Sequence, residues 1–476
     1  MDEHDLWRWS IAEAAEALRT EAVSSTQLTR LMLERIARFD PMLHSFQAVA
    51  AEAALATAAV LDQEAAAGRW RGPLHGIPFA IKDAFFTTRI PTGLGSPVFD
   101  AWQAPYDSTA TARLEEAGAV LLGKLTLTEG VYADHHPTTV PPVNPFGPAH
   151  WTGTSSSGSG VAVTAGLCYG ALGTDTGGSI RLPSACCGLT GIKPTWGRVS
   201  RHGVFPLAES LDHVGPMART ARDAALMLQA IAGQDPNDPT ASPASVPDYV
   251  GLIEGGVADL TVGIDWGAIE ARADAEVVAS LRAVAVIVEG LGARLVDVRM
   301  PPSDAILTGW AVQCAVEAAI AHRPFYPSRR DEYGARFAAL LERGRAFSGE
   351  ALAEALAERR LYTGRMAQLF DGIDLLLVPA LPVAGPTLDF MASLGEDPAG
   401  ILAIGPFTAP FDVCGYPTIT LPCGESGSGI PIGFQFAAKP FAEELLCRAA
   451  HAYQGTTGWH LRRPDLDSLP PVSAGG

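Results

Sequence analysis

Between residues 76 and 215, short apolar segments alternate with stretches of helical pattern, and this alternation constrains the fold more than any other feature of the chain. It is typical of an α/β domain, in which helices pack against a sheet. Further apolar segments at about 259–265, 375–379 and 418–422 are expected to be buried strands. The chain has 476 residues, enough for a large core. We therefore expect an α/β protein.

Helical patterns precede and follow this region. Ser10 with Glu13, and Ser24 with Gln27, have the spacing of capping boxes, which predicts two helix starts. Residues 233–249 are rich in Pro, Asp and Ser, which predicts a surface loop. The other stretches with a helical pattern cover about 48–67, 274–291 and 349–370.

Lysine is rare in this chain. Of 34 Lys and Arg residues only four are lysines, which leaves 34 − 4 = 30 arginines. Lys82 follows the apolar run that begins at Gly76, so we expect it to be buried. Burial favours the neutral amine, which is a base, whereas arginine keeps its proton. The remaining lysines are expected to be structural: Lys124, Lys193 and Lys439.

Two Gly/Ser-rich segments follow Lys82 in the chain. Residues 151–166 have the pattern of a tight loop that leads into a helix, and residues 173–184 that of a strand end, a Gly-Gly turn and a short helix. Glycines beside a serine allow a substrate carbonyl to approach the backbone. Four backbone N–H groups are candidates for an oxyanion hole: those of Thr176, Gly177, Gly178 and Ser179.

Several other interpretations of these loops fail on spacing. No Gly-Lys-[Ser/Thr] closes the first segment, so it is not a phosphate-binding P-loop. Gly158 and Gly160 lack the third glycine of a dinucleotide fingerprint, and Arg181 stands where a nucleophile elbow requires glycine. On spacing alone, a serine nucleophile and a structural glycine turn both remain open.

At these positions the chain resembles the amidase signature family. The family motifs that carry the resemblance lie at Gly76–Asp83, Gly153–Ser159 and Gly173–Ser184. The two working serines of the family are 24 positions apart, as are Ser155 and Ser179 here (179 − 155 = 24). The resemblance implies a single α/β domain with a central mixed sheet covered by helices on both faces.

The resemblance also implies a division of the single domain 1–476 into regions, with a core that is interrupted by a more variable stretch. The expected regions are a helical N-terminal part (about 1–68), a core (about 70–235), a variable substrate-lining part (about 236–370), a C-terminal return to the core (about 371–461) and a loose tail (462–476).

The resemblance assigns roles in catalysis. Ser179 is implied to be the nucleophile, Ser155 the bridging serine and Lys82 the base, with an acyl-enzyme intermediate. A cis peptide bond is implied between Thr154 and Ser155. Asp175 and Arg181 are expected to hold the turn together by polar contacts, and Asp412 stands where the family commonly has asparagine.

The substrate is less constrained. Four aromatic residues are expected to line the pocket: Tyr132, Trp151, Trp310 and Phe325. They favour a hydrophobic or aryl amide, an anilide or a carbamate, with esters as side substrates. The family also contains the glutaminase subunit of tRNA-dependent amidotransferases, so delivery of ammonia to a partner is the alternative.

Composition bears on partners and location. The net charge is −18, which argues against nucleic acid and anionic membranes as partners. No signal peptide, membrane span, metal-ligand cluster or cofactor motif is evident, and the seven cysteines are scattered. We expect a cytoplasmic enzyme that needs neither cofactor nor metal, has reduced thiols, and forms a homodimer as some members of the family do.

Overall fold

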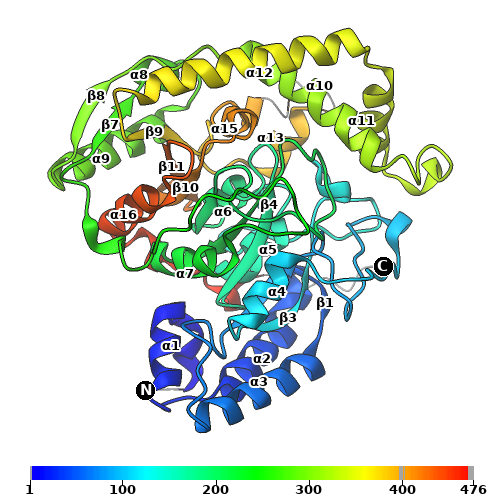
Figure 1. Ribbon diagram of the computed structural model, residues 1–476, viewed down its shortest axis with the longest axis vertical. Helices are drawn as coiled ribbons and strands as arrows, with labels where there is room; N and C mark the ends of the chain where they lie inside the picture. Colours follow the sequence, from blue (N-terminus) through cyan, green and yellow to red (C-terminus); the bar gives the residue numbers. More distant parts are fainter. Residues whose placement is uncertain (1–2, 396–399, 401–402, 470–476) are drawn as a thin grey trace.

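The computed structural model describes residues 3–395, 400 and 403–469, and these residues contain one eleven-stranded sheet (Figure 1). The strand order is β1-β3-β2-β4-β6-β5-β10-β11-β9-β7-β8. The strands are β1 (Phe46–Val49), β2 (Pro78–Lys82), β3 (Val120–Leu125), β4 (Gly170–Asp175), β5 (Thr190–Lys193), β6 (His213–Ala218), β7 (Thr261–Ile264), β8 (Arg294–Asp297), β9 (Leu375–Pro379), β10 (Thr418–Glu425) and β11 (Pro431–Ala438).

The sheet is mixed, as the sequence predicts. β2 runs parallel to β3 and β4, and β7 runs parallel to β8 and β9. The other pairs of neighbours are antiparallel. The chain enters the sheet in one half, leaves it after β6, and returns to both its centre and its far edge, so that one sheet unites the whole domain.

Helices are placed close to their predicted positions. The longer ones are α1 (Ile11–Arg19), α2 (Ser25–Leu43), α3 (Ala51–Ala66), α4 (Thr109–Glu116), α5 (Ser157–Thr164), α7 (Ala221–Ile231), α9 (Ala275–Gly290), α10 (Asp304–Ala321), α11 (Ala335–Ala346), α12 (Gly349–Phe370) and α16 (Glu443–Gln454). The short ones are α6 (Arg181–Cys186), α8 (Trp266–Glu270), α13 (Leu388–Ser393) and α15 (Ala409–Cys414). Both capping boxes are present, at the starts of α1 and α2.

One predicted boundary is wrong. The Ala-rich helix was expected from about residue 48, but it begins at Ala51 because Phe46–Val49 form β1, which pairs with β3. The predicted strands at 259–265 and 418–422 form at Thr261–Ile264 and Thr418–Glu425. The surface loop at 233–249 contains no helix or strand.

Two glycines of β4 show that helices cover both faces of the sheet. A Cβ added at Gly170 would meet Met227 of α7, whereas one added at Gly173 would meet Ser156 and Ile180 beside α5 and α6. Residues three apart in a strand point to opposite faces. Therefore α7 lies on one face, and the Gly/Ser-rich loops with α5 and α6 lie on the other.

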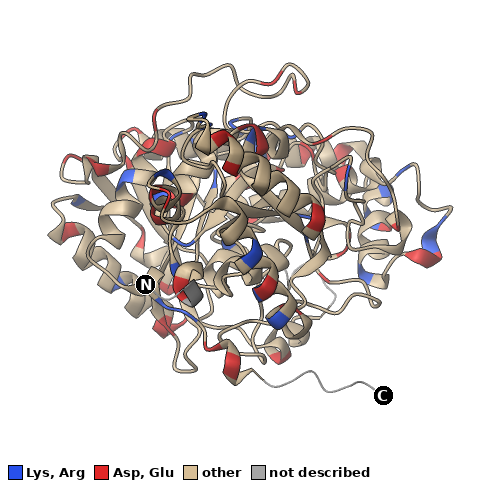
Figure 2. Ribbon diagram, turned by 90° about the horizontal axis from the view of Figure 1, so that it is seen from below, with Lys and Arg blue, Asp and Glu red and all other residues tan. Residues whose placement is uncertain are grey.

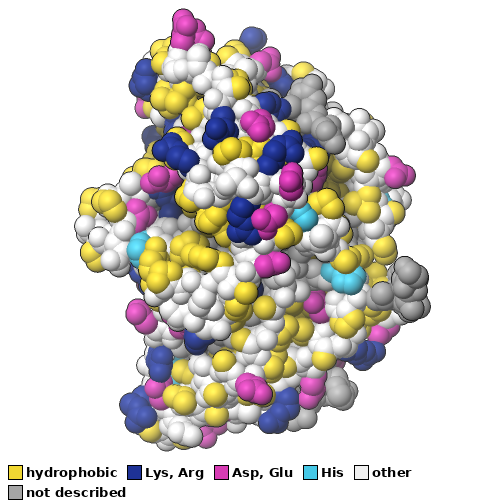
Figure 3. All heavy atoms as spheres, turned by 90° about the vertical axis from the view of Figure 1, so that its right-hand side faces the viewer, with side chains coloured by type: hydrophobic (Ala, Val, Ile, Leu, Met, Phe, Trp, Pro, Cys, Tyr) yellow, Lys and Arg dark blue, Asp and Glu magenta, His cyan; other side chains and the backbone are white. Residues whose placement is uncertain are grey.

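The N-terminal helices α1–α3 lie together at one end of the molecule, and α10–α12 lie at the opposite end (Figure 1). Figures 2 and 3 show acidic and basic residues interspersed over the two views. The seven cysteines are free thiols.

Among the described residues, α10 is the one helix long and apolar enough to cross a membrane. Its buried residues include Trp310, Gln313 and Cys314, and it packs against α11 and α12. This packing is that of a core helix.

Two helical glycines give a test of this packing. A Cβ on Gly344 of α11 would lie 1.9 Å from the Ala315 carbonyl oxygen of α10, whereas a Cβ on Gly364 of α12 would meet nothing within 4 Å. We expect Gly344→Ala to lower the free energy of unfolding by about 1–3 kcal/mol. Gly364→Ala should raise it by about 0.5–1 kcal/mol, because alanine favours helix. Urea unfolding measures both; an unchanged Gly344→Ala would contradict the close helix contact.

Candidate active site

Lys82 lies at the end of β2 and is completely buried. Its Nζ donates to Ser155 Oγ at 2.6 Å and to Thr174 Oγ1 at 2.8 Å. Burial lowers the pKa of Lys82 to about 7, although the negative charges of Asp212 and Asp175 act to raise it. The amine is therefore poised to be neutral in neutral solution, as the sequence analysis expected of a buried lysine.

Ser155 lies immediately before α5 and is also fully buried. The predicted cis peptide bond between Thr154 and Ser155 is present. Thr154 Oγ1 donates to the carbonyl oxygens of Tyr132 and Ala133, at 2.9 and 3.0 Å. These bonds tie the serine loop to the 131–133 segment and fix the position from which Ser155 reaches Lys82.

Ser179 occupies the turn between β4 and α6 and lines the largest mainly apolar cavity among the described residues. Its 7% exposure contrasts with the 0% of Ser155. The described hydrogen bonds join Lys82 to Ser155 but include no direct bond between Ser155 and Ser179. Both serines nevertheless belong to segments that Lys82 connects, because Thr174 of β4 accepts from the same amine.

The expected oxyanion hole needs one correction. The N–H of Gly178 donates to Asp175 Oδ1 at 2.6 Å, so it is not available to a substrate oxygen. Within the described part of the chain, the N–H groups of Thr176, Gly177 and Ser179 have no acceptor. These three are the remaining candidates to bind an oxyanion.

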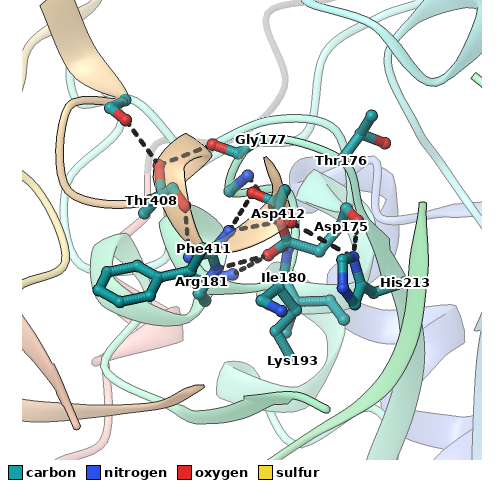
Figure 4. A network of polar contacts seen from close by, with 12 residues as sticks. Asp175, Thr176, Gly177, Ile180, Arg181, Lys193, His213, Thr408, Phe411 and Asp412 are labelled. Atoms are coloured by element: carbon teal, nitrogen blue, oxygen red, sulfur yellow. Dashed lines mark hydrogen bonds and ion pairs between the residues drawn. The ribbon is translucent and has the colours of Figure 1, made fainter. Parts of the chain in front are cut away.

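A buried ion-pair network holds this turn (Figure 4). Arg181 donates to Asp175 through Nε at 2.9 Å and through Nη2 at 2.8 Å, and Nη2 also contacts Asp412. The Nη1 group of Arg181 donates to the Thr408 carbonyl at 2.8 Å. The polar contacts expected for Asp175 and Arg181 are therefore present, and they join the turn to α15.

The two carboxylates of the network have different pKa values. Burial acts to raise the pKa of Asp175, but the Arg181 charge and its hydrogen bonds hold it well below the usual range. Burial raises the pKa of Asp412 well above its usual range, and repulsion from Asp175 adds to this effect, against the opposing charge of Arg181. Asp175 is thus the ionised partner of Arg181, and Asp412 is the one that retains a proton.

The cavity beside Ser179 has a volume of about 610 Å³. Tyr132, Trp151 and Trp310 line it, as predicted. Phe325 does not: it packs against Phe99 with ring centroids 4.8 Å apart, in an aromatic cluster away from the cavity. That prediction is wrong because an aromatic residue in a variable region fills a core as readily as it lines a pocket.

Most of the cavity wall comes from other segments than the expected region 236–370, which supplies only Trp310 and Arg336 among the described lining residues. The remaining lining residues belong to 131–154, 176–182, Leu207 and 388–405. The apolar members of the last segment are Leu388, Met391, Ala392, Leu394 and Ile404. No motif in the sequence marks this segment, so sequence reasoning missed it.

His135 and His136 also line the cavity, while His150 bonds to Ser428 elsewhere. Burial lowers the pKa of His135 to about 4, so its ring is neutral. His135 Nε2 lies 3.1 Å from Ser157 Oγ, not beside Ser179 or Lys82. The two histidines therefore shape the pocket, as the sequence analysis favoured.

Three further side chains support the site without having been predicted to do so. Trp310 Nε1 donates to the Thr176 carbonyl at 2.8 Å, and Thr408 Oγ1 donates to the Gly177 carbonyl at 2.6 Å. Thr176 Oγ1 donates to Asp212 at 2.6 Å. Thr176 and Asp212 lie within the family-like segments, but Thr408 is brought in only by the tertiary fold.

Comparisons with known proteins agree with this geometry. Residues 27–447 match the family model Amidase. AmiD of Mycobacterium tuberculosis, named an amidase, is 44% identical over 473 residues, which cover 98% of each chain. A chain of the glutamyl-tRNA(Gln) amidotransferase of Anaeromyxobacter dehalogenans is 38% identical over 479 residues, covering 95% of this chain and 97% of that one. The structure of 6-aminohexanoate cyclic dimer hydrolase complexed with substrate has a TM-score of 0.87 at 26% identity and covers 97% and 99% of the two chains.

Fold and similarity together define a hydrolase that acts on carbon–nitrogen bonds other than those of an ordinary peptidase substrate. The chain belongs to the amidase family.

The buried amine predicts a stability effect. The pKa of Lys82 is about 7 in the folded protein and near 10.4 when unfolded, so the unfolded state binds more protons between these values. Stability should therefore rise with pH across this window. We expect Lys82→Met to raise the melting temperature by several degrees at pH 7, with a difference that shrinks toward pH 10.

Lys439 is exposed, and Lys439→Met is the matched control. Thermal unfolding by circular dichroism between pH 7 and 10 measures both variants. An equal effect of the two substitutions, or a Lys82→Met gain independent of pH, would contradict the assignment of a depressed pKa to Lys82.

Proposed function

We propose that this protein hydrolyses the C–N bond of a small hydrophobic or aryl amide through Ser179, Ser155 and Lys82 and an acyl-enzyme intermediate. The observation that carries the proposal is the 2.6 Å hydrogen bond from the buried Lys82 amine to Ser155, beside a cavity that Ser179 lines. A serine hydroxyl becomes a nucleophile when a base accepts its proton. Lys82, with a pKa of about 7, is such a base.

In the first half-reaction, Ser179 Oγ attacks the amide carbonyl carbon. Its proton passes to Ser155 Oγ, and the proton of Ser155 passes to the neutral amine of Lys82. The carbonyl oxygen becomes an oxyanion that the N–H groups of Thr176, Gly177 and Ser179 bind. Collapse of this intermediate breaks the C–N bond, and the leaving nitrogen takes the proton back from Lys82 by way of Ser155.

The second half-reaction repeats these steps with water. The serine–lysine pair removes a proton from a water molecule, which attacks the ester carbonyl of acylated Ser179. The ester bond breaks, Ser179 regains its proton, and the carboxylic acid leaves. The net change is amide plus water to acid plus amine, so no redox partner or cofactor enters the balance.

The cavity walls favour an apolar group on the substrate. Trp151, Trp310 and Met391 provide aromatic and polarisable surface on different sides of the space near Ser179. Polar groups lie at one part of the wall, where Arg336 pairs with Asp134 at 2.8 Å. An aryl or alkyl amide or anilide fits this lining, and a carbamate presents the same carbonyl to Ser179.

A second candidate is the glutaminase component of an amidotransferase, because a relative from such an enzyme is 38% identical over nearly the whole chain. Such a component would release ammonia from glutamine for a partner protein. We favour independent hydrolysis of a small molecule in the cytoplasm, with no nucleic acid or membrane partner, and assign any homodimer no role in the chemistry.

A substrate panel tests the proposal. Purified protein should hydrolyse an aryl anilide or aryl carbamate, with an aryl ester as a weaker substrate, faster than a short aliphatic amide and much faster than glutamine. Ser179→Ala, Ser155→Ala and Lys82→Ala should each reduce kcat/KM by about 10³-fold or more. Liquid chromatography of the released amine measures all of these rates.

Ser159→Ala is the matched control, because Ser159 lies in the same helix and its hydroxyl donates to the Leu172 carbonyl rather than to the relay. It should retain most of the activity. Turnover of glutamine alone, or turnover only after other proteins are added, would favour the amidotransferase alternative. Full activity of Ser179→Ala would refute the assigned nucleophile.

The pH dependence gives a separate test. Activity requires neutral Lys82, so kcat/KM should rise with pH up to a limb near pH 7. The charge of Asp212 raises the Lys82 pKa, so Asp212→Asn should move this limb to lower pH. Glu289→Gln removes an exposed charge on α9 and should leave the limb in place. A shift to higher pH in Asp212→Asn would exclude Lys82 as the base.

A further inference from the structure

Another cavity, of about 440 Å³, lies between the N-terminal helices and the C-terminal segment. Its charged lining residues are Arg8, Arg35, Arg38, Arg463, Asp465 and Asp467, so arginines outnumber aspartates by four to two. We call this space the arginine cavity. The whole chain has a net charge of −18, so four arginines around one cavity stand against the overall charge of the protein.

Two of these arginines have carboxylate partners. Arg8 pairs with Asp5 at 2.9 Å, and Arg38 pairs with Asp467 at 2.6 Å, both largely exposed to solvent. Exposed pairs of this kind hold their partners weakly, because water and salt screen them. They therefore leave Arg8 and Arg38 free to rearrange around another anion.

Arg35 and Arg463 have no carboxylate within ion-pair distance in the part of the chain that the structure describes. Arg35 donates through Nε and Nη2 to the carbonyls of Gly166 and Ala165, at 2.9 and 2.8 Å. Arg463 donates to the carbonyls of His460 and Arg462, each at 2.9 Å. The buried Nε of Arg463 has no acceptor among the described residues.

A third guanidinium, that of Arg219, lies behind this group and is 2% exposed. Its Nε and Nη1 atoms are buried without an acceptor among the described residues. Burial lowers the pKa of Arg35 to about 10 and that of Arg463 to about 9, and repulsion from neighbouring arginines, including Arg219, adds to both shifts. Arginine keeps its proton in proteins, so these shifts express an unfavourable accumulation of positive charge.

We propose that the arginine cavity binds a phosphate group, either as inorganic phosphate or as part of a small phosphate monoester. A dianion would balance the two guanidinium groups, Arg35 and Arg463, that lack carboxylate partners among the described residues. Guanidinium forks match the geometry of phosphate oxygens and bind them through paired N–H groups. The site is separate from Ser179 and its cavity, so this inference does not depend on the proposed hydrolysis.

A bound anion would join three parts of the chain. Arg8 follows Trp7 at the N-terminus, Arg35 and Arg38 lie on α2, and Arg463 lies near the C-terminal end of the described chain. A ligand that binds only the folded state stabilises it in proportion to the logarithm of its concentration. Phosphate binding is therefore measurable as a saturable rise in melting temperature, independent of any catalytic assay.

The test is calorimetric titration of the full chain with inorganic phosphate and, separately, with glycerol 3-phosphate, at constant ionic strength. We expect one site per chain, with no corresponding heat from sodium chloride or acetate. Arg463→Gln should raise Kd by about tenfold or more, because one charge-assisted contact is lost. Arg30→Gln, an equal charge change at an exposed position of the same helix as Arg35, should bind as the parent protein does.

Thermal unfolding provides the second readout. High phosphate stabilises many proteins by exclusion from their surface, and that effect should be equal in all variants. A saturable rise in the parent and in Arg30→Gln, reduced in Arg463→Gln and Arg38→Gln, would support the site. Equal rises in all variants, or the absence of a calorimetric signal with both ligands, would overturn it. Tighter binding of glycerol 3-phosphate would identify an ester as the better ligand, and tighter binding of phosphate the free ion.

Arg35→Gln serves as a third variant where it folds, since Arg35 also satisfies carbonyls at the end of α5. Circular dichroism and hydrolysis of the best panel substrate check that Arg463→Gln and Arg38→Gln are folded. Loss of phosphate binding in folded variants that retain hydrolysis would separate this site from the active site.

Discussion

The buried ion pair between Asp175 and Arg181 is the interaction on which the rest of the site depends. Both side chains are fully buried, and Arg181 meets both oxygens of the carboxylate. The same carboxylate accepts from the N–H groups of Gly178 and Ile180. It therefore sets the path of the turn that carries Ser179, and it directs the other N–H groups of that turn toward the cavity. Removal of either partner would leave an uncompensated buried charge.

This pair also explains why a carboxyl group is tolerated at Asp412. Two ionised carboxylates beside one guanidinium would leave an excess of buried negative charge, so Asp412 retains a proton while Asp175 remains ionised. A protonated carboxyl has one donor and one acceptor, as an amide has on the same framework. Asp412 can thus occupy the place of the asparagine common in the family without disturbing the pairing of Arg181.

The sequence was most informative where chemistry restricts the residue type. The placement of Lys82 after a buried strand, the spacing of Ser155 and Ser179, and the cis peptide bond followed from motifs and from the family resemblance, and the structure contains the bond and the contact between Lys82 and Ser155. The mixed sheet and most helices also followed. The acceptor for the Gly178 N–H could not be predicted, because it depends on how the turn folds back toward Asp175.

The pocket was predicted less well for a physical reason. Apolar residues satisfy the same hydrophobic requirement in a core as in a cavity wall, so Phe325 and Trp310 cannot be distinguished by type. Their placement is decided by the crossing of α10 with its neighbours, which turns Trp310 toward the Thr176 carbonyl and leaves Phe325 against Phe99. The 388–405 segment reaches the cavity through long-range packing that no local pattern encodes.

This division separates the chemistry from the choice of substrate. Lys82, Thr174 and Asp175 lie on adjacent strands in the middle of the sheet, where the ladder fixes their positions and where burial sets their protonation. The cavity walls come mainly from loops and short helices outside the sheet. A change in the walls can alter which amide reaches Ser179 without moving the amine or the ion pair. The fold thus fixes the reaction, and its periphery selects the substrate.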